Sequence, residues 1–330
     1  MRFLLIVLLA FPAFATGLFD VRVQKVTDGV YVASRAEPLR PYVEGNVTLI
    51  INEHDVVVVD AGGSPRIARN IIAELQKLTK NPVSTLVYTH IHRDHRFGTQ
   101  EWVKAFPGIE IIAHPLVRKV IDADDGKFVA GRIARLENNR AEAEKQIADF
   151  RAAGNEPMAK YLERYRNDVP VVVEEYRHTV NLPPTATFEQ KLTLHRGPRI
   201  IDLLFLGRGD TDHDVVVHLP KERVVVAGDM VVHPFPYGFS AQPVEWIATM
   251  EKLAILEFDH LVPGHGDVQR GKTYLRRVIE LVKAVQSGAD LSPFENEMAG
   301  DDPVARYYFH ENFVKPAVAE AQKARGTAPR

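Results

Sequence analysis

The sequence predicts an α/β fold in which helices lie outside two β-sheets. Short apolar segments alternate with amphipathic helical segments up to about residue 120, and this alternation is typical of α/β proteins. Two further strand-like segments, 215–217 and 224–226, extend the pattern. With 330 residues, 45% of them hydrophobic, the chain is long enough to bury a large core.

Residues 1–15 have the three parts of a secretory signal peptide. A short region with Arg2 precedes an apolar run over 3–9, and Ala13-Phe14-Ala15 supplies a small-x-small cleavage site. The apolar run is too short for a comfortable membrane span. We expect a mature chain that starts near Thr16, is periplasmic or secreted, and has no stable membrane span. The alternatives are a buried N-terminal strand and a retained anchor.

The segments 65–78 and 84–88 predict a helix followed by a buried strand. In the first segment, Ile67, Ile71 and Leu75 recur at the spacing of one helical face. The second segment, Ser-Thr-Leu-Val-Tyr, is short and apolar, as expected of a buried strand. Whatever follows it stands at the carboxyl end of a strand, where open α/β sheets carry their sites.

The segment that follows, 89–95, is the most informative of the chain. It reads Thr-His-Ile-His-Arg-Asp-His and places His90, His92, Asp94 and His95 within six positions. His90 and His92 alternate with an isoleucine, so both imidazoles can point to one side. Imidazole with carboxylate suits zinc, and also iron or manganese. The segment therefore predicts a metal site rather than a turn of solvated histidines.

Two later regions predict helices. Residues 131–168 carry apolar side chains at helical spacing and predict an insertion of one or two amphipathic helices, broken near Gly154 and Pro157. This insertion is expected either to cover the site or to form a surface helical pair or dimer contact. Residues 272–330 predict a helical C-terminal extension in which Pro316 kinks or restarts a helix. No internal repeat or low-complexity linker divides the chain, so we expect residues 16–330 to form a single domain.

The pattern His-x-His-x-Asp-His resembles the metallo-β-lactamase superfamily of metal-dependent hydrolases. Further segments match that family in order: an opening hairpin at 45–51 and 56–63, a third-ligand loop at 206–214, a bridging-aspartate strand at 224–230, and a final-histidine loop at 263–267. The resemblance runs from about residue 30 to about residue 267. It implies an αββα sandwich of the metallo-β-lactamase type.

The resemblance also implies a site for two metal ions. His90 and His92 match ligands of the first ion, and Asp94, His95 and His265 match ligands of the second. Asp229 matches the carboxylate that bridges both ions. Two zinc ions are expected, with iron or manganese as alternatives.

Asp210 is the main departure from the family pattern, because its position normally holds a histidine ligand of the first ion. Asp210 could bind that ion itself, which would give a more anionic site that tolerates iron or manganese better. His213, three residues on, could reach in instead. In the third case the first ion binds weakly or is missing.

The implied reaction is hydrolysis by a metal-bound hydroxide, with Asp94 as the candidate for proton transfer. Dedicated β-lactamases of this superfamily generally lack an aspartate at the position of Asp229, so dedicated antibiotic hydrolysis is not expected. Tyr237, in an aromatic segment after Asp229, is a candidate substrate-binding residue that donates to a developing oxyanion. Asp60 and His233 are expected to support ligating histidines by hydrogen bonds.

Composition narrows the function further. The chain has no cysteine, which excludes disulfides and a thiolate ligand. A net charge of −2 provides no basic footprint for nucleic acid. We therefore expect an exported enzyme that cleaves an ester, thioester, lactone or amide bond of a small-molecule substrate. The competing hypothesis is a non-catalytic or maturation protein that binds a metal or metabolite with a degraded first site.

Overall fold

The computed structural model describes residues 17–326, apart from 36, 38, 40, 41, 125 and 240. The expected signal peptide, residues 1–15, lies outside the described residues. Of the helices that are described, none combines the length and the apolar character needed to cross a membrane.

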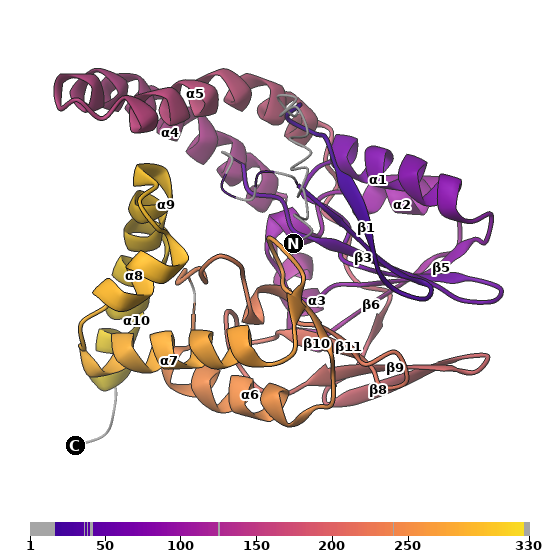
Figure 1. Cartoon of the computed structure of the whole chain (residues 1–330). Helices are drawn as coiled ribbons and strands as arrows, with labels where there is room; N and C mark the ends of the chain where they lie inside the picture. The colour runs from indigo at the N-terminus through magenta and orange to yellow at the C-terminus, as the bar shows by residue number, and fades with distance from the viewer. Residues whose placement is uncertain are drawn as a thin grey trace, which may run out of the picture.

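Two β-sheets form the centre of the molecule (Figure 1). In the first sheet the strands lie side by side in their sequence order: β1 Arg22–Thr27, β2 Val30–Ser34, β3 Val47–Ile51, β4 Val56–Val59, β5 Val83–Val87, β6 Glu110–Ala113 and β7 Ala186–Thr187. The second has the order β13-β12-β11-β10-β9-β8: β13 Gln269–Arg270, β12 His260–Val262, β11 Val224–Val226, β10 Val215–Leu219, β9 Arg199–Phe205 and β8 Lys191–Arg196. Side chains of both sheets, among them Val57, Val87 and Val217, share one fully buried cluster. The sheets therefore pack face to face.

Helices cover the outer face of each sheet (Figure 1). The first sheet carries α1 Pro65–Leu78, α2 Thr99–Ala105 and α3 Pro115–Asp122, and the second carries α6 Pro243–Ile255 and α7 Thr273–Ser287. Helix α1 has the bounds that its apolar spacing predicts, because the Ser64 side chain caps Ile67 N and Pro65 occupies the first turn. The four layers confirm the predicted αββα sandwich.

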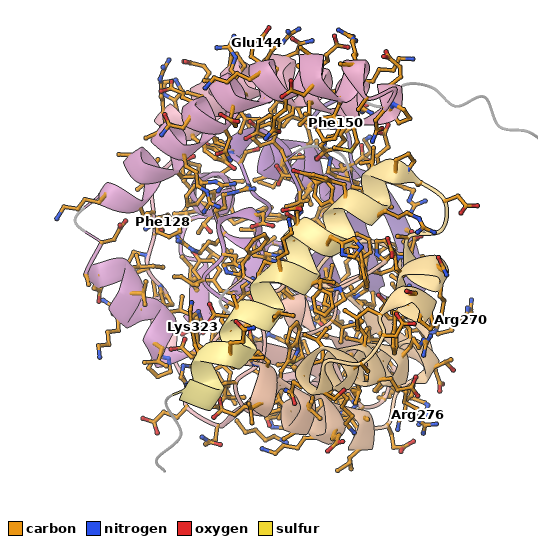
Figure 2. All side chains as sticks on the ribbon, turned by 90° about the vertical axis from the view of Figure 1, so that its left-hand side faces the viewer. Phe128, Glu144, Phe150, Arg270, Arg276 and Lys323 are labelled. Atoms are coloured by element: carbon orange, nitrogen blue, oxygen red, sulfur yellow. The ribbon has the colours of Figure 1, made fainter. Side chains whose placement is uncertain are left out.

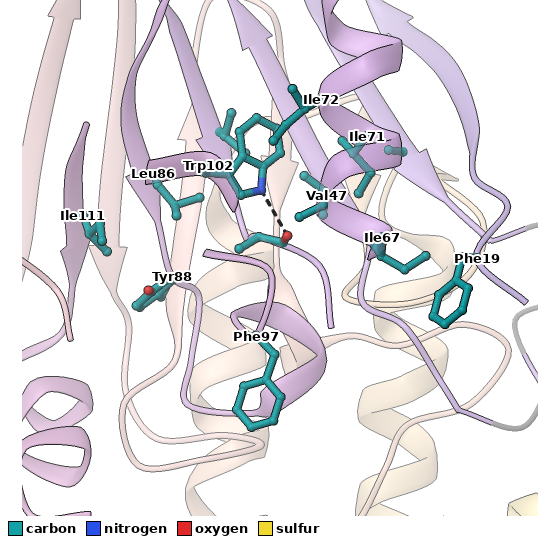
Figure 3. Close-up of a cluster of buried hydrophobic side chains, with 14 of the residues drawn as sticks. Phe19, Val47, Ile67, Ile71, Ile72, Leu86, Tyr88, Phe97, Trp102 and Ile111 are labelled. Carbon is teal, nitrogen blue, oxygen red and sulfur yellow. Dashed lines mark hydrogen bonds between the residues drawn. The ribbon is translucent and has the colours of Figure 1, made fainter. Parts of the chain in front are cut away.

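The core between α1, α2 and the first sheet is shown in Figure 3. Ile67 and Ile71 of α1 and Val47 of β3 meet there with Trp102 of α2, which is fully buried. The Trp102 Nε1–H donates to the Ala61 carbonyl oxygen at 3.1 Å. Since a buried indole N–H needs a partner, this bond satisfies it and ties α2 to the loop after β4.

Two long helices form a hairpin, α4 Lys127–Ala152 and α5 Glu156–Arg177. They extend on both sides of the predicted range 131–168, and beyond 168 Val169, Val172 and Tyr176 are buried at helical spacing. The turn between them, 153–155, contains Gly154, as predicted, whereas Pro157 lies in the first turn of α5. Figure 1 places the hairpin at the same end of the sandwich as the C-terminal helices. In Figure 2 Phe150 lies on its inner side and Glu144 on its outer side. The Phe150 and Tyr307 rings lie 6.2 Å apart, so the hairpin contacts the C-terminal helices.

The C-terminal helices close that end of the molecule. They are α8 Ser292–Met298, α9 Pro303–Tyr308, a π-helical turn Phe309–Val314, and α10 Lys315–Gly326. Pro316 is the second residue of α10, which continues directly from the π-helical turn without an intervening loop. Phe309 and Phe313 are fully buried in the cluster that also holds Trp246 of α6.

Candidate metal centre

The predicted ligands come from loops that leave strands of both sheets. His90, His92, Asp94 and His95 follow β5 of the first sheet. The other three lie on the second sheet: Asp210 between β9 and β10, Asp229 after β11, and His265 after β12. The fold brings all seven side chains together in two neighbouring groups.

The first group contains His90, His92, Asp210 and Asp229. The His92 Nδ1 atom lies 3.3 Å from Asp210 Oδ2 and 4.0 Å from Asp229 Oδ2. The His90 Nε2 atom lies 3.6 Å from the same Asp229 oxygen. His90, Asp210 and Asp229 are buried, whereas 30% of the His92 side chain is exposed. The first group therefore opens to its surroundings at His92.

The second group contains Asp94, His95 and His265. The His265 Nε2 atom lies 3.2 Å from both Asp94 Oδ2 and His95 Nε2. Both histidine nitrogens also approach Asp229 Oδ1, at 3.1 Å from His95 and 3.3 Å from His265. Asp229 thus presents Oδ2 to the first group and Oδ1 to the second, the position of a bridging carboxylate.

The chemistry of these donors fits divalent metal ions. Within the described part of the chain, the buried His90 Nε2 atom makes no hydrogen bond. Burial, aided by His95, lowers the pKa of His90 well below its ordinary value, which keeps the imidazole in the neutral form that binds metals. Burial raises the pKa of Asp210 well above its ordinary value, and the nearby Asp229 adds to the shift. The buried carboxylates of Asp94, Asp210 and Asp229 lie close enough to repel one another, and bound cations would relieve that repulsion.

Asp60 orients the cluster from the end of β4. Its Oδ2 accepts a hydrogen bond from His95 Nδ1 at 2.7 Å. Its Oδ1 accepts from the Thr89 amide at 2.8 Å, and the Thr89 hydroxyl lies 2.9 Å from His90 Nδ1. Both histidines therefore keep Nε2 for the side of the cluster that holds Asp229.

His213 lies outside the two groups. Its Nε2 accepts a hydrogen bond from the Ile91 amide at 3.2 Å, and its Nδ1 contacts Asp212. The His213 side chain thus supports the backbone between His90 and His92. The loop is held by Asp214, which accepts hydrogen bonds from the Thr211 amide at 2.9 Å and the Thr211 hydroxyl at 2.7 Å. This geometry favours Asp210 over His213 as the fourth donor of the first group.

The two remaining candidate residues lie beside His265. His233 contacts the His265 loop through its backbone, with its N–H donating to the His265 carbonyl oxygen at 3.1 Å. Its ring packs against Tyr274, at 5.2 Å between centroids. Tyr237 is buried, and its ring centroid lies 5.3 Å from that of His265. Tyr237 also lines a cavity of about 660 Å³ that reaches His92, Asp94 and Asp229.

Three supporting residues had not been singled out from the sequence. Asn46, before β3, donates through Nδ2 to the carbonyl oxygens of Pro263 and Gly266, both at 2.9 Å. Gly264 leaves room for the bridging carboxylate, since a Cβ there would lie 1.9 Å from Asp229 Oδ1. Arg93 donates to the Tyr176 hydroxyl at 2.6 Å and lies beside Asp94. The sequence signals that could have revealed Asn46 and Arg93 were a Gly-Asn pair before a strand and an arginine between two candidate ligands.

Fold and site together define a sandwich with a histidine–carboxylate cluster at the ends of its strands, the layout of a metal-dependent hydrolase. Residues 40–265 match the family model of the metallo-β-lactamase superfamily. Since the match covers well over half of the chain, the protein belongs to this superfamily, whose β-lactamase and alkylsulfatase members are metal-dependent hydrolases.

Known proteins similar to the chain include a linear primary-alkylsulfatase from Pseudomonas sp. (strain ATCC 19151). It is 25% identical over 240 residues, which are 69% of this chain and 42% of the alkylsulfatase. The chain thus spans less than half of that relative. A metallo-β-lactamase from Pontibacter korlensis superposes with a TM-score of 0.56 at 16% identity, covering 80% of this chain and 99% of its own. The DIM-1 metallo-β-lactamase superposes at 0.54 with 18% identity, covering 80% and 98%. These structural likenesses establish the shared fold.

Proposed function

We propose that the protein is a hydrolase with two metal ions that cleaves a small ester, thioester, lactone or amide. The observation that carries this proposal is the position of Asp229, whose two oxygens face two separate ligand groups. His90, His92 and Asp210 would hold one ion, and Asp94, His95 and His265 the other. Two divalent ions so placed would supply an activated water and polarise the bond to be cleaved.

The protein side chains would handle the proton and the developing charge. Burial raises the pKa of Asp94, but Arg93 and His265 outweigh it and hold that pKa well below its ordinary value. We assign to this ionised carboxylate the acceptance of the proton from water. Burial and Asp229 raise the pKa of Tyr237 well above its ordinary value. Its hydroxyl stays protonated at neutral pH and is our candidate donor to the oxyanion.

Sulfate esters are the second candidate substrates. The alkylsulfatase relative favours them, and so does a cavity wall that carries Arg93, Lys127, Arg132 and Arg135. Because the chain spans only 42% of that relative, the activity is a proposal for this protein. Alkyl sulfates of moderate chain length are the appropriate test compounds.

Zinc and export complete the proposal. Four histidines with carboxylates suit zinc, and the anionic Asp210 favours iron or manganese more than a histidine would. Export rests on the sequence of residues 1–15, and mass spectrometry of the expressed protein would reveal a mature N-terminus near Thr16.

Elemental analysis of protein purified without added metal or chelator tests the proposal. We expect two equivalents of metal per chain, together with hydrolysis of 4-nitrophenyl esters that a chelator abolishes. One equivalent or fewer, with no hydrolysis of esters, thioesters, lactones, amides or alkyl sulfates, would instead support the non-catalytic metal-binding protein.

A further inference from the structure

The cavity beside the metal centre is both cationic and aromatic. It has a volume of about 660 Å³, and six aromatic side chains line it. Helix α4 contributes Lys127, Arg132 and Arg135, which lie on one face of the helix, and Arg93 comes from the loop that carries the ligands. Among the described residues of its wall, the carboxylates are those of Asp94 and Asp229, both proposed to bind metal.

Arg132 differs from three other arginines of the α4–α5 hairpin. Arg151, Arg164 and Arg166 each pair with a glutamate, at 2.7, 2.8 and 2.9 Å. Among the described residues, Arg132 makes neither an ion pair nor a hydrogen bond, although its Nε atom is buried. A buried donor without a partner costs free energy, which a bound acceptor would recover.

Arg132 also faces a second positive charge. The Arg93 guanidinium, together with burial, lowers the pKa of Arg132 to about 10, so both side chains are positive at neutral pH. Arg93 donates one hydrogen bond to the Tyr176 hydroxyl. Glu44, which lies close enough to Arg93 to raise its pKa, is buried and accepts a hydrogen bond from the Gly63 amide at 2.8 Å. The two guanidinium groups thus repel each other across the cavity wall.

We propose that Arg132 and Arg93 bind a negatively charged group of the substrate, so that this hydrolase acts on anionic esters with an apolar portion. The proposal rests on the hydrolase function proposed above. A guanidinium binds carboxylate or sulfate through two parallel hydrogen bonds, and the aromatic wall accepts the apolar part. The anion is either a carboxylate remote from the cleaved bond or the sulfate group that reacts.

A matched pair of substrates tests the inference. The esters 4-nitrophenyl hydrogen glutarate and 4-nitrophenyl valerate have acyl chains of equal length, and only the first carries a terminal carboxylate. We expect Arg132→Gln to raise the ratio of the KM for the glutarate ester to the KM for the valerate ester by about 10- to 100-fold. Arg132→Lys should recover part of the loss, since it restores the charge without the planar fork. Arg140→Gln, an exposed position on the same helix, is the control and should leave the ratio unchanged.

Thermal stability provides a readout that needs no turnover. Glutarate or octyl sulfate should raise the melting temperature of the wild type and of Arg140→Gln, and Arg132→Gln should lose that rise. If the rise in melting temperature depends on Arg132 with octyl sulfate but not with glutarate, the bound anion is the reacting sulfate. If it depends on Arg132 with glutarate but not with octyl sulfate, the bound anion is a remote carboxylate. Parallel KM changes for both esters, together with a rise in Arg132→Gln equal to that of the wild type for both glutarate and octyl sulfate, would overturn the inference. If the metal-loaded wild type cleaves no substrate while the Arg132-dependent rise persists, the hydrolase function fails and the anion site stands.

Discussion

The His95 Nδ1 atom donates to Asp60 Oδ2 at 2.7 Å, and this bond fixes which nitrogen of His95 faces the cluster. The same carboxylate accepts from the Thr89 hydroxyl, which lies 2.9 Å from His90 Nδ1. One aspartate thus orients a histidine from each of the two ligand groups. This arrangement couples the two proposed metal sites through a single buried carboxylate.

Asp60→Asn should weaken metal binding by about 10- to 100-fold, the usual cost of losing a partner that orients a ligand. The amide keeps the shape of the side chain but removes the negative charge from the group that accepts the hydrogen bond of His95 Nδ1. Competition with a chromophoric chelator measures the affinity. Asp149→Asn, at an exposed position of α4, is the control. Equal affinity in wild type and Asp60→Asn would show that Asp60 does not orient the ligands.

A pair of variants distinguishes Asp210 from His213 as the donor to the first ion. Asp210→Ala should reduce the metal content from two equivalents to about one, because Asp210 lies 3.3 Å from His92 Nδ1. His213→Ala should retain two equivalents and lose only about 1 kcal/mol of stability, since it removes the acceptor for the Ile91 amide. Elemental analysis and thermal melts measure both effects. The opposite pattern would identify His213 as the ligand.

Gly264→Ala should deplete the metal. The added Cβ would lie 1.9 Å from Asp229 Oδ1 and 2.7 Å from the Gly228 carbonyl carbon, so the bridging carboxylate has to move. The measurement is the metal content per chain after gel filtration, and the gel filtration itself shows whether the variant folds. In Gly131→Ala of α4 the new methyl group meets nothing within 4 Å, so its metal content should equal that of the wild type. Two tightly held ions in Gly264→Ala would be inconsistent with Asp229 as the bridge.

Tyr237→Phe should lower kcat by about 100-fold while both metals stay bound, as expected when one donor to an oxyanion is lost. The ring packing against His265 is retained in phenylalanine. Steady-state kinetics with a carboxylic ester and elemental analysis give the two readouts. A kcat within twofold of the wild type would restrict Tyr237 to a packing role.

Much of the fold was predictable because the relevant signals are local. Helix α1 has the predicted bounds, since Ser64, Pro65 and the apolar spacing all act within the helix. Helices α4 and α5 proved longer than the predicted range 131–168. Helix α5 continues through Pro170, because Val172, Val173 and Tyr176 are buried in the core beyond it. His90, His92, Asp94 and His95 were marked by their spacing in one short segment after a strand, whereas the resemblance to the metallo-β-lactamase superfamily implied Asp210, Asp229 and His265.

The sequence by itself determined the αββα sandwich and a cluster of histidines and carboxylates, because strand patterning and ligand spacing are properties of short segments. Only the tertiary structure decided that Asp210 faces His92 while His213 turns to the Ile91 amide. It alone placed Arg132 beside Arg93, from segments about 40 residues apart whose contact depends on how α4 packs over the site. Such choices depend on the packing of distant elements, which no local pattern encodes.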